Sequence, residues 1–369
     1  MTGPSGLAER INTAKVIVCC GSGGVGKTTT AAAIAIEAAY RGRRSVVVTI
    51  DPAKRLADAL GIQGLSNSPT RIAGDWDGSL SALMLDTEGT FDALVMAYAA
   101  SDEQAQKIMT NRFYRNIAGA LSGTQEYMAT EKLYELATST AYDLVVVDTP
   151  TTRNALDFLE APGRLARFLD HRLYRVVTAP TRGLVRAVNL AAQPFLRSVA
   201  KVVGGEVIAD ALAFFAAFDG MEEGFKQRAR MVDELLSDEL TAFVLVASPQ
   251  HDTIAEATFF ANRLLDYDIV VRSVVVNRVH PQFTSMPSEE SRLLAARSEG
   301  LALADYFTNL ADLTDVAVAE REHLTVLQQA TDTPLVEVPY LPAEISDLES
   351  LRSLSHFIFR PETALATGE

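Results

Sequence analysis

Eight residues near the amino terminus combine glycine, lysine and threonine at the spacing of a phosphate-binding loop, or P-loop (Walker A). Gly21 to Thr28 read G-S-G-G-V-G-K-T, between an apolar run and a helix-prone run. Glycines let the chain curl so that successive backbone N–H groups point at phosphate oxygens. Lys27 then reaches the outer phosphates and the Thr28 hydroxyl ligates Mg²⁺, so the sequence predicts a bound nucleoside triphosphate. The predicted contacts are Gly21, Ser22, Gly23, Gly24, Val25, Gly26, Lys27, Thr28 and Thr29.

Two aspartates follow apolar runs and are expected at the same end of a sheet. Asp148 comes after four apolar residues, and a Mg²⁺ ion at a P-loop needs a carboxylate nearby, usually through water. Asp51 also ends a strand-like run and is expected to act as the base or positioning group for the attacking water. An N-cap of a helix from Lys54 to Leu60 is the alternative for Asp51, and it is compatible with catalysis. The predicted metal site is Thr28, Asp51 and Asp148.

Short β-branched runs alternate with helical stretches along the chain, which indicates parallel strands joined by crossover helices. The expected fold is α/β, a P-loop NTPase with a doubly wound, mainly parallel sheet and helical insertions, and ligands bind at the carboxyl ends of such strands. The expected strands are Lys15 to Cys20, Ser45 to Ile50, Leu80 to Leu85, Tyr142 to Asp148, Ala242 to Val246, Ile269 to Asn277 and Leu335 to Val338.

Two helical stretches interrupt this alternation, at about 87–141 and 161–237, and together they are expected to form a helical subdomain. The ATPase-like domain is predicted to span 15–355 as one unit, followed by a frayed tail at 360–369. Between Arg153 and Lys201 the chain has eight Arg and one Lys. A solvated helical face explains this cluster, and a surface for an acidic partner or anionic lipid is the alternative.

Composition narrows the class of protein further. The 369 residues include 47 acidic and 33 basic side chains, a net charge of −14, and this argues against a general nucleic-acid binder. Cys19 and Cys20 are the two cysteines and are expected to be core thiols in a reducing compartment. Neither a secretion leader nor an apolar run of about 18 residues is apparent, so a cytoplasmic location is expected.

Three motifs together resemble the ArsA family, which covers arsenite-pump ATPases and the guided-entry ATPases that deliver tail-anchored membrane proteins. They are the P-loop with its second threonine, D-P-A-x-x-L-x-D-A-L-G at Asp51 to Gly61, and D-T-P-x-x-R-N-A-L-D-F-L at Asp148 to Leu159. The resemblance implies ATP and Mg²⁺ as cofactors and ATP hydrolysis coupled to opening and closing of a dimer. It also implies a protein or membrane-associated client that the sequence does not identify.

Weaker similarities extend toward the carboxyl terminus. Gly123 to Leu133 resembles the family's P-G-x-x-E segment, and Val338 to Pro342, with Pro339 and Pro342, resembles its adenine loop. Asn277 and Arg278 resemble the segment that contacts adenine, and no N-K-x-D motif that would select guanine is present. The resemblance therefore implies an adenine nucleotide.

The chain departs from the family at the second position of the loop, where Ser22 replaces a lysine that reaches the opposite subunit's phosphates. Three explanations stay open: Arg55, Arg153 or another basic residue substitutes, the ATPase is slow, or the chain pairs with a paralogue that retains the lysine. A homodimer or a heterodimer is therefore possible. The other functions considered are an ATP-binding regulatory subunit with little activity of its own and a membrane-surface ATPase resembling MinD or ParA.

Overall fold

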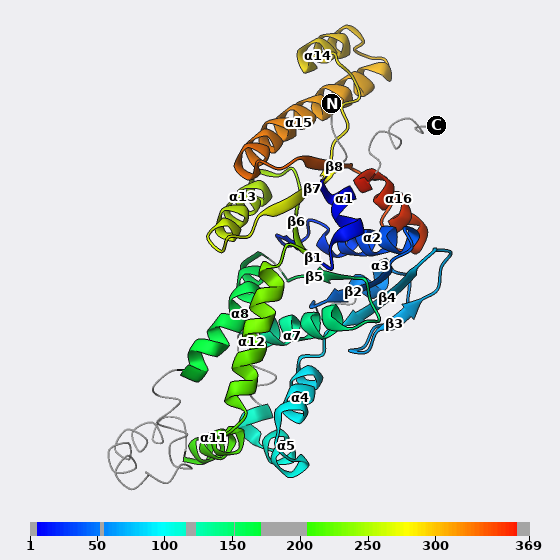
Figure 1. The fold of residues 1–369 in the computed structure, drawn as a ribbon. Helices are drawn as coiled ribbons and strands as arrows, with labels where there is room; N and C mark the ends of the chain where they lie inside the picture. Colours follow the sequence, from blue (N-terminus) through cyan, green and yellow to red (C-terminus); the bar gives the residue numbers. More distant parts are fainter. Residues whose placement is uncertain (1–5, 52–54, 116–122, 151, 171–204, 360–369) are drawn as a thin grey trace.

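The computed structural model describes residues 6–51, 55–115, 123–150, 152–170 and 205–359. An eight-stranded sheet, in the order β3-β4-β2-β5-β1-β6-β7-β8, forms its centre (Figure 1). The strands are β1 (Val16–Gly21), β2 (Arg44–Thr49), β3 (Thr70–Ile72), β4 (Ser79–Met84), β5 (Leu144–Asp148), β6 (Thr241–Ala247), β7 (Val271–Val279) and β8 (Leu335–Pro339).

The predicted α/β class and all seven expected strands are confirmed, with bounds that shift by one or two residues. Every neighbouring pair is parallel except β3 with β4, which is antiparallel. The sequence missed β3 because it has three residues, two of them exposed, and so carries too short a pattern to recognise. Residue Asn277 was expected at the end of its strand and instead lies inside β7, which continues to Val279.

The sheet is buried on both faces, as its continuous apolar strands predicted. Alternate residues of β1 enter two different hydrophobic clusters: Val16, Val18 and Cys20 face one, whereas Ile17 and Cys19 face the other. This two-residue period follows from the pleat of a strand. Both cysteines are free and buried in the core. A strand that is apolar on both sides requires a helical layer over each face.

Helices form those two layers. One layer consists of α1 (Gly6–Thr13), α2 (Lys27–Tyr40), α3 (Arg55–Ala59) and α16 (Leu348–Phe359). The opposite layer consists of α7 (Thr124–Thr138), α8 (Thr152–Asp170), α12 (Glu222–Ser237), α13 (His251–Leu265) and the second half of α15 (Leu303–Thr331). The helix-prone run that follows the P-loop is α2, which begins at Lys27.

Helices from both insertions share a third hydrophobic cluster, away from the sheet. Besides parts of α7, α8 and α12, it includes α4 (Thr87–Tyr98), α5 (Asp102–Met109) and α11 (Gly205–Phe218), which lie together at the bottom of Figure 1. Aromatic rings such as Phe214, Phe218 and Phe225 pack at centroid distances of 4.9 to 5.6 Å. The division into domain and subdomain stays a prediction. Residues 116–122, most of the Arg-rich stretch and the 360–369 tail lie outside the described residues.

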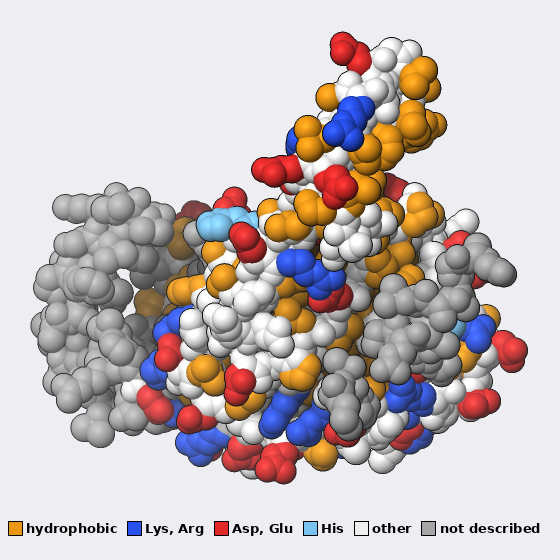
Figure 2. All heavy atoms as spheres, turned by 90° about the horizontal axis from the view of Figure 1, so that it is seen from above, with side chains coloured by type: hydrophobic (Ala, Val, Ile, Leu, Met, Phe, Trp, Pro, Cys, Tyr) orange, Lys and Arg blue, Asp and Glu red, His pale blue; other side chains and the backbone are white. Residues whose placement is uncertain are grey.

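A helical hairpin of α14 (Ser288–Arg297) and the first half of α15 extends from the body beyond the end of β7. Figure 2 shows hydrophobic side chains along this arm. Leu301, Leu303 and Tyr306 are exposed. Across the described part of the chain, no helix has the length and apolar character needed to span a membrane.

Candidate functional site

The P-loop connects β1 to α2, and α2 begins at Lys27. Gly26 has a φ of +98°, in the left-handed region that favours glycine. A Cβ at this position would lie 2.3 Å from the side-chain nitrogen of Asn277, so any other residue would also require that side chain to move. The predicted strand-loop-helix arrangement is therefore present, and its backbone depends on glycine.

A cleft of about 750 Å³ opens at the carboxyl ends of the strands, where the fold predicts a ligand. Twelve of the fifteen predicted site residues line it: Gly23, Gly24, Gly26, Lys27, Thr28, Thr29, Asp51, Asp148, Asn277, Arg278, Pro339 and Pro342. Gly21, Ser22 and Val25 do not. These three are buried beneath the loop, as expected for residues that contribute mainly backbone.

Asp148, the last residue of β5, lies at the floor of the cleft and is 1% exposed. Its Oδ2 accepts hydrogen bonds from the hydroxyls of Thr28 at 2.7 Å and Thr49 at 2.9 Å, whereas its buried Oδ1 has no partner. Burial raises the pKa of the carboxyl to about 6, against the two hydroxyl hydrogen bonds, which lower it. Sequence reasoning missed Thr49, although β2 and β5 are adjacent and place it beside Asp148 in register.

This arrangement fits a hard divalent cation. Mg²⁺ binds oxygen ligands and keeps several waters, so a P-loop hydroxyl, one carboxylate and nucleotide phosphates are enough. Thr28 and Asp148 provide the two protein groups, and the unpartnered Oδ1 leaves one carboxylate oxygen available for a water of the ion. Among the described residues no cluster of three or more His, Cys, Asp and Glu could hold a metal alone. A site at this position therefore needs the phosphates of a nucleotide.

Lys27 is 9% exposed, and its ammonium group donates to the carbonyl of Ser22 at 2.8 Å. Burial lowers its pKa, an effect that the nearby carboxylate of Asp148 opposes. The Ser22 carbonyl therefore accepts a hydrogen bond from the same ammonium group that is predicted to bind phosphate. Ser22 itself is 6% exposed and its hydroxyl has no hydrogen-bond partner.

Asp51 lies on the cleft just after β2, with its carboxylate 3.5 Å from the guanidinium of Arg55. Arg55 begins α3 and lines the cleft too, so a second cation stands near Lys27. The N-cap alternative for Asp51 depends on residues 52–54, which lie outside the described residues. The side chain of Arg153 also lies outside them.

Gln125 links this end of the sheet to the helical insertions. Its amide donates to the carbonyl of Ile50, the residue before Asp51, at 3.0 Å. Gln125 stands in the first turn of α7, where Gly123 and Glu126 form the helix cap. Sequence reasoning found the segment by its resemblance to P-G-x-x-E but did not identify Gln125.

Two of the residues expected to contact a base, Asn277 and Arg278, lie on the opposite wall of the cleft and hydrogen-bond directly to the P-loop. Asn277 donates to the carbonyl of Val25 at 3.0 Å, and Arg278, with a φ of +64°, donates to the carbonyl of Gly24 at 3.2 Å. Their recognition of adenine stays a prediction. Tyr340, inside the predicted segment Val338 to Pro342, also lines the cleft, although the sequence did not single it out.

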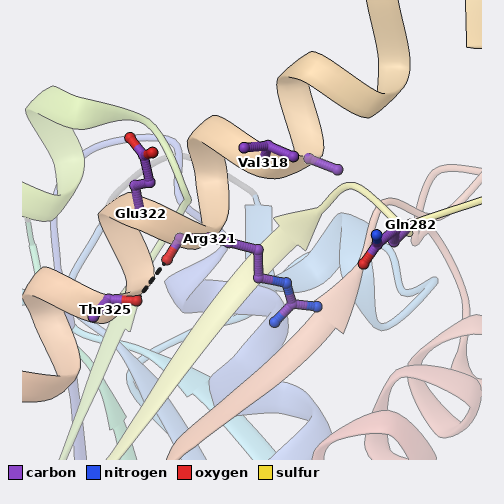
Figure 3. Close-up of a pocket in the computed structure, with 6 residues that line it drawn as sticks. Gln282, Val318, Arg321, Glu322 and Thr325 are labelled. Carbon is purple, nitrogen blue, oxygen red and sulfur yellow. Dashed lines mark hydrogen bonds between the residues drawn. The ribbon is translucent and has the colours of Figure 1, made fainter. Parts of the chain in front are cut away.

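A second hollow, of about 240 Å³, lies on α15 (Figure 3). Its labelled side chains are Gln282, Val318, Arg321, Glu322 and Thr325, all but the first from α15. The guanidinium of Arg321 pairs with Glu337 at 2.5 Å and so is not free to bind phosphate. This hollow shares no residue with the P-loop cleft, which is therefore the candidate active site.

Comparison with known proteins agrees with this geometry. The sequence model of the family described as anion-transporting ATPase matches residues 14–310. ATPase GET3 of Malassezia globosa is 25% identical over 348 residues, 94% of this chain and 91% of that protein. The ATPase ASNA1 homolog of Dictyostelium discoideum is 23% identical over 94% of this chain and 90% of its own length, and ATPase get3 of Schizosaccharomyces pombe is 22% identical over 96% and 94%. A family match over this much of the sequence means that the chain belongs to the anion-transporting ATPase family and is an ATPase.

Proposed function

We propose that the chain hydrolyses ATP with Mg²⁺ in the P-loop cleft and that the nucleotide state changes the arrangement of its helical insertions within a dimer. The observation that supports this most is the meeting of Thr28, in the first turn of α2, with Asp51 and Asp148, at the ends of β2 and β5, around one phosphate loop. Phosphoryl transfer needs positioned cations and an oriented water more than covalent chemistry. This cleft has residues of both kinds.

Each residue has a separate role in the proposed reaction. Lys27 leaves the Ser22 carbonyl and binds the outer phosphates, and the N–H groups of the loop hold the phosphate oxygens. Thr28 and Asp148 hold Mg²⁺, which when bound neutralises charge on the phosphates. Asp51 accepts a proton from the attacking water, or orients it, in line with the terminal phosphate. Arg55 is close enough to Asp51 to stabilise the charge that develops.

Two connections would carry the nucleotide state to the helices. Gln125 joins α7 to the backbone next to Asp51, and α8 begins four residues after Asp148. Residues of α7 and of α8 also belong to the third hydrophobic cluster. A movement of either aspartate would therefore be transmitted to the helical insertions through few residues.

Partner, client and location follow from the resemblance and are part of the proposal. We propose a homodimer or heterodimer in the cytoplasm with a protein client, and we propose no nucleic-acid partner because of the net charge of −14. One observation favours a second function, that of a regulatory subunit in a hetero-oligomer. Ser22 is short, uncharged and buried, so it does not reach beyond its own loop.

Steady-state ATP hydrolysis by the purified chain tests both functions. Turnover that needs Mg²⁺ and falls about a hundredfold or more in Asp51→Asn supports the self-sufficient enzyme. Absence of turnover in the purified chain, with activity in a complex co-purified from the native host, supports the regulatory subunit. Activity that is equal in Asp51→Asn and wild type would exclude the proposed role of Asp51.

A further inference from the structure

The backbone of β7 is irregular where it passes the P-loop. Between Val276 and Val279 three steps along β7 match two along β8, so β7 carries one extra residue, a bulge. Asn277 and Arg278 lie inside this bulge. Bulges redirect side chains and are common beside active sites. Here both side chains of the bulge hydrogen-bond to carbonyls of the P-loop.

The left-handed backbone of Arg278, with a φ of +64°, has no explanation in its own residue type. Among the described residues two others that are not glycine have a positive φ, Asp268 and Asp332, in the turns that follow α13 and α15. Aspartate tolerates this region because its short polar side chain can hydrogen-bond locally, whereas arginine gains nothing comparable. Backbone strain of this kind is concentrated at functional sites.

The guanidinium of Arg278 is open to a ligand. The residue is exposed and lines the P-loop cleft, and its Nη1 donates to the Gly24 carbonyl at 3.2 Å. Within the described residues no carboxylate pairs with it, and a guanidinium has five N–H groups, so donors remain for a second acceptor. Arg55, the other arginine that lines the cleft in the described part of the chain, already lies 3.5 Å from the carboxylate of Asp51.

The reaction needs positive charge at this loop. In ATP hydrolysis the water oxygen bonds to the γ-phosphorus and gives its proton to Asp51, while the bond from that phosphorus to the β–γ bridging oxygen breaks and leaves its electron pair on ADP. Positioned cations stabilise the charge on the oxygens of the transferring group. Lys27 supplies one such cation, and the short, buried side chain of Ser22 supplies none.

We propose that Arg278 is a catalytic residue that donates hydrogen bonds to the transferring phosphoryl group of the nucleotide in its own subunit. The inference rests on the proposed function and deepens it, since it gives Arg278 a phosphate contact in place of the base contact expected from the sequence. The Gly24 carbonyl holds the guanidinium on the loop, three residues before Lys27. Arg278 thus brings to the loop the charge that Ser22 lacks.

The test measures ADP binding with Mg²⁺ by calorimetry, with and without aluminium fluoride, which mimics the transferring phosphoryl group. Arg278→Ala should bind ADP within about twofold of wild type and lose about a hundredfold of the affinity gained from aluminium fluoride. Its kcat should fall by a similar factor, with KM for ATP changed by less than about threefold. Arg278→Lys keeps the charge without the planar fork and should recover about tenfold.

Two further variants control for charge and for folding. Arg292→Ala removes an arginine from the exposed arm and should change none of these quantities. Arg278→Gly removes the guanidinium and relieves the left-handed backbone. Its midpoint of thermal unfolding should be no lower than that of wild type, while its response to aluminium fluoride is lost as in Arg278→Ala.

A mixture of Arg278→Ala with Lys27→Ala tests whether Arg278 serves its own subunit. Each subunit of a mixed dimer lacks one of the two cations, so the mixture should be as inactive as the two variants are separately. Restored activity would show that Arg278 acts on the nucleotide of the opposite subunit and would overturn the assignment.

The binding experiment separates the remaining outcomes. Weaker ADP binding in Arg278→Ala, with the response to aluminium fluoride retained, would make Arg278 a base contact and overturn its catalytic role. Wild-type behaviour of Arg278→Ala, or a wild-type protein that binds ADP without any gain from aluminium fluoride, would also overturn that role and leave nucleotide binding intact. A wild-type protein that binds neither ADP nor ATP would overturn the proposed function itself.

Discussion

The phosphate end of the sheet and the core of the helical insertions differ in whether their buried polar atoms have hydrogen-bond partners. At the P-loop, Asp148 Oδ1 and Ser22 Oγ are buried without a hydrogen-bond partner. Between α7 and α12, buried Glu131 receives both the guanidinium of Arg228, at 2.7 Å, and the hydroxyl of Tyr127, at 2.5 Å. Within the described parts of the insertion helices no buried side-chain atom is left unpartnered.

The difference separates groups kept for a ligand from groups that hold the fold together. An unpaired buried polar atom costs about 1–3 kcal/mol, a cost that the proposed metal site would offset at Asp148 Oδ1, whereas Thr258 Oγ1 and Ser273 Oγ are unpartnered away from the cleft. The network of Glu131, Arg228 and Tyr134, whose ring lies 3.9 Å from the guanidinium, already has its partners. Substitutions in the first region should therefore lower activity, and those in the second should lower stability.

The largest effect is expected for Lys27→Ala. Loss of the cation should reduce kcat/KM for ATP by about a hundredfold to a thousandfold, because phosphoryl transfer depends on electrostatic stabilisation. The free energy of unfolding should change by less than about 1 kcal/mol, because Lys27 makes a single side-chain hydrogen bond to its own loop. Kinetics and urea unfolding measure the two quantities. A marked loss of stability with activity retained would contradict the comparison.

Arg228→Leu should give the reverse result. Removing the guanidinium leaves Glu131, which is 2% exposed, without its cation and should cost about 3 kcal/mol of unfolding free energy. The matched control is Arg292→Leu on the arm, whose partners Asp312 and Asp315 are exposed and which should cost less than about 1 kcal/mol. Urea unfolding of both variants measures this difference. Equal midpoints for the two would show that burial of the pair contributes nothing.

Asp148→Asn should raise stability while it removes Mg²⁺ binding. Burial holds the pKa of this carboxyl at about 6, above its ordinary value of 3.8, so the folded state binds the proton more tightly than the unfolded state. Stability from this group is therefore gained as pH falls and lost as pH rises through 6. At pH 8 the neutral amide should stabilise the protein without nucleotide by about 1–2 kcal/mol.

Thermal unfolding at pH 8 and pH 5 checks this sign, since the advantage of the variant should shrink at the lower pH. The wild type should also lose Mg²⁺ affinity as pH falls below about 6, because the proton competes with the ion. Titration of Mg²⁺ in the presence of a fixed concentration of ATP measures that loss. A Mg²⁺ affinity that is the same at pH 5 and pH 8 would exclude Asp148 from the metal site.

The smallest effect is expected at the border between the two regions. Gln125→Ala removes one hydrogen bond to the Ile50 carbonyl and should cost about 1 kcal/mol. Hydrogen exchange at the end of β2 should become faster, and the response of α7 to ATP should weaken. Gln282→Ala on the surface of the small hollow is the control. Unchanged exchange in Gln125→Ala would mean that the two regions are coupled elsewhere.

The phosphate loop and its sheet could be predicted because their signals are local. A glycine-rich loop between a strand and a helix can be recognised from adjacent residues alone, and so can an aspartate after four apolar residues. Thr49 and Gln125 could not be found in this way, because each acquires its role from a residue distant in the chain. Strand β3 was missed for a different reason, since three residues carry no usable period.

The position of β1 between β5 and β6 has a consequence for biosynthesis. A chain that emerges from the ribosome amino end first presents β1, apolar on both faces, long before its second neighbour, Thr241–Ala247, is made. Unpaired edges of this kind promote aggregation until the sheet closes. Because the proposed ATP site is lined by residues from Gly23 to Ile345, ATP bound there would stabilise only a nearly complete chain. Truncated chains should gain nothing from the nucleotide, which makes ATP a ligand that distinguishes finished molecules from unfinished ones.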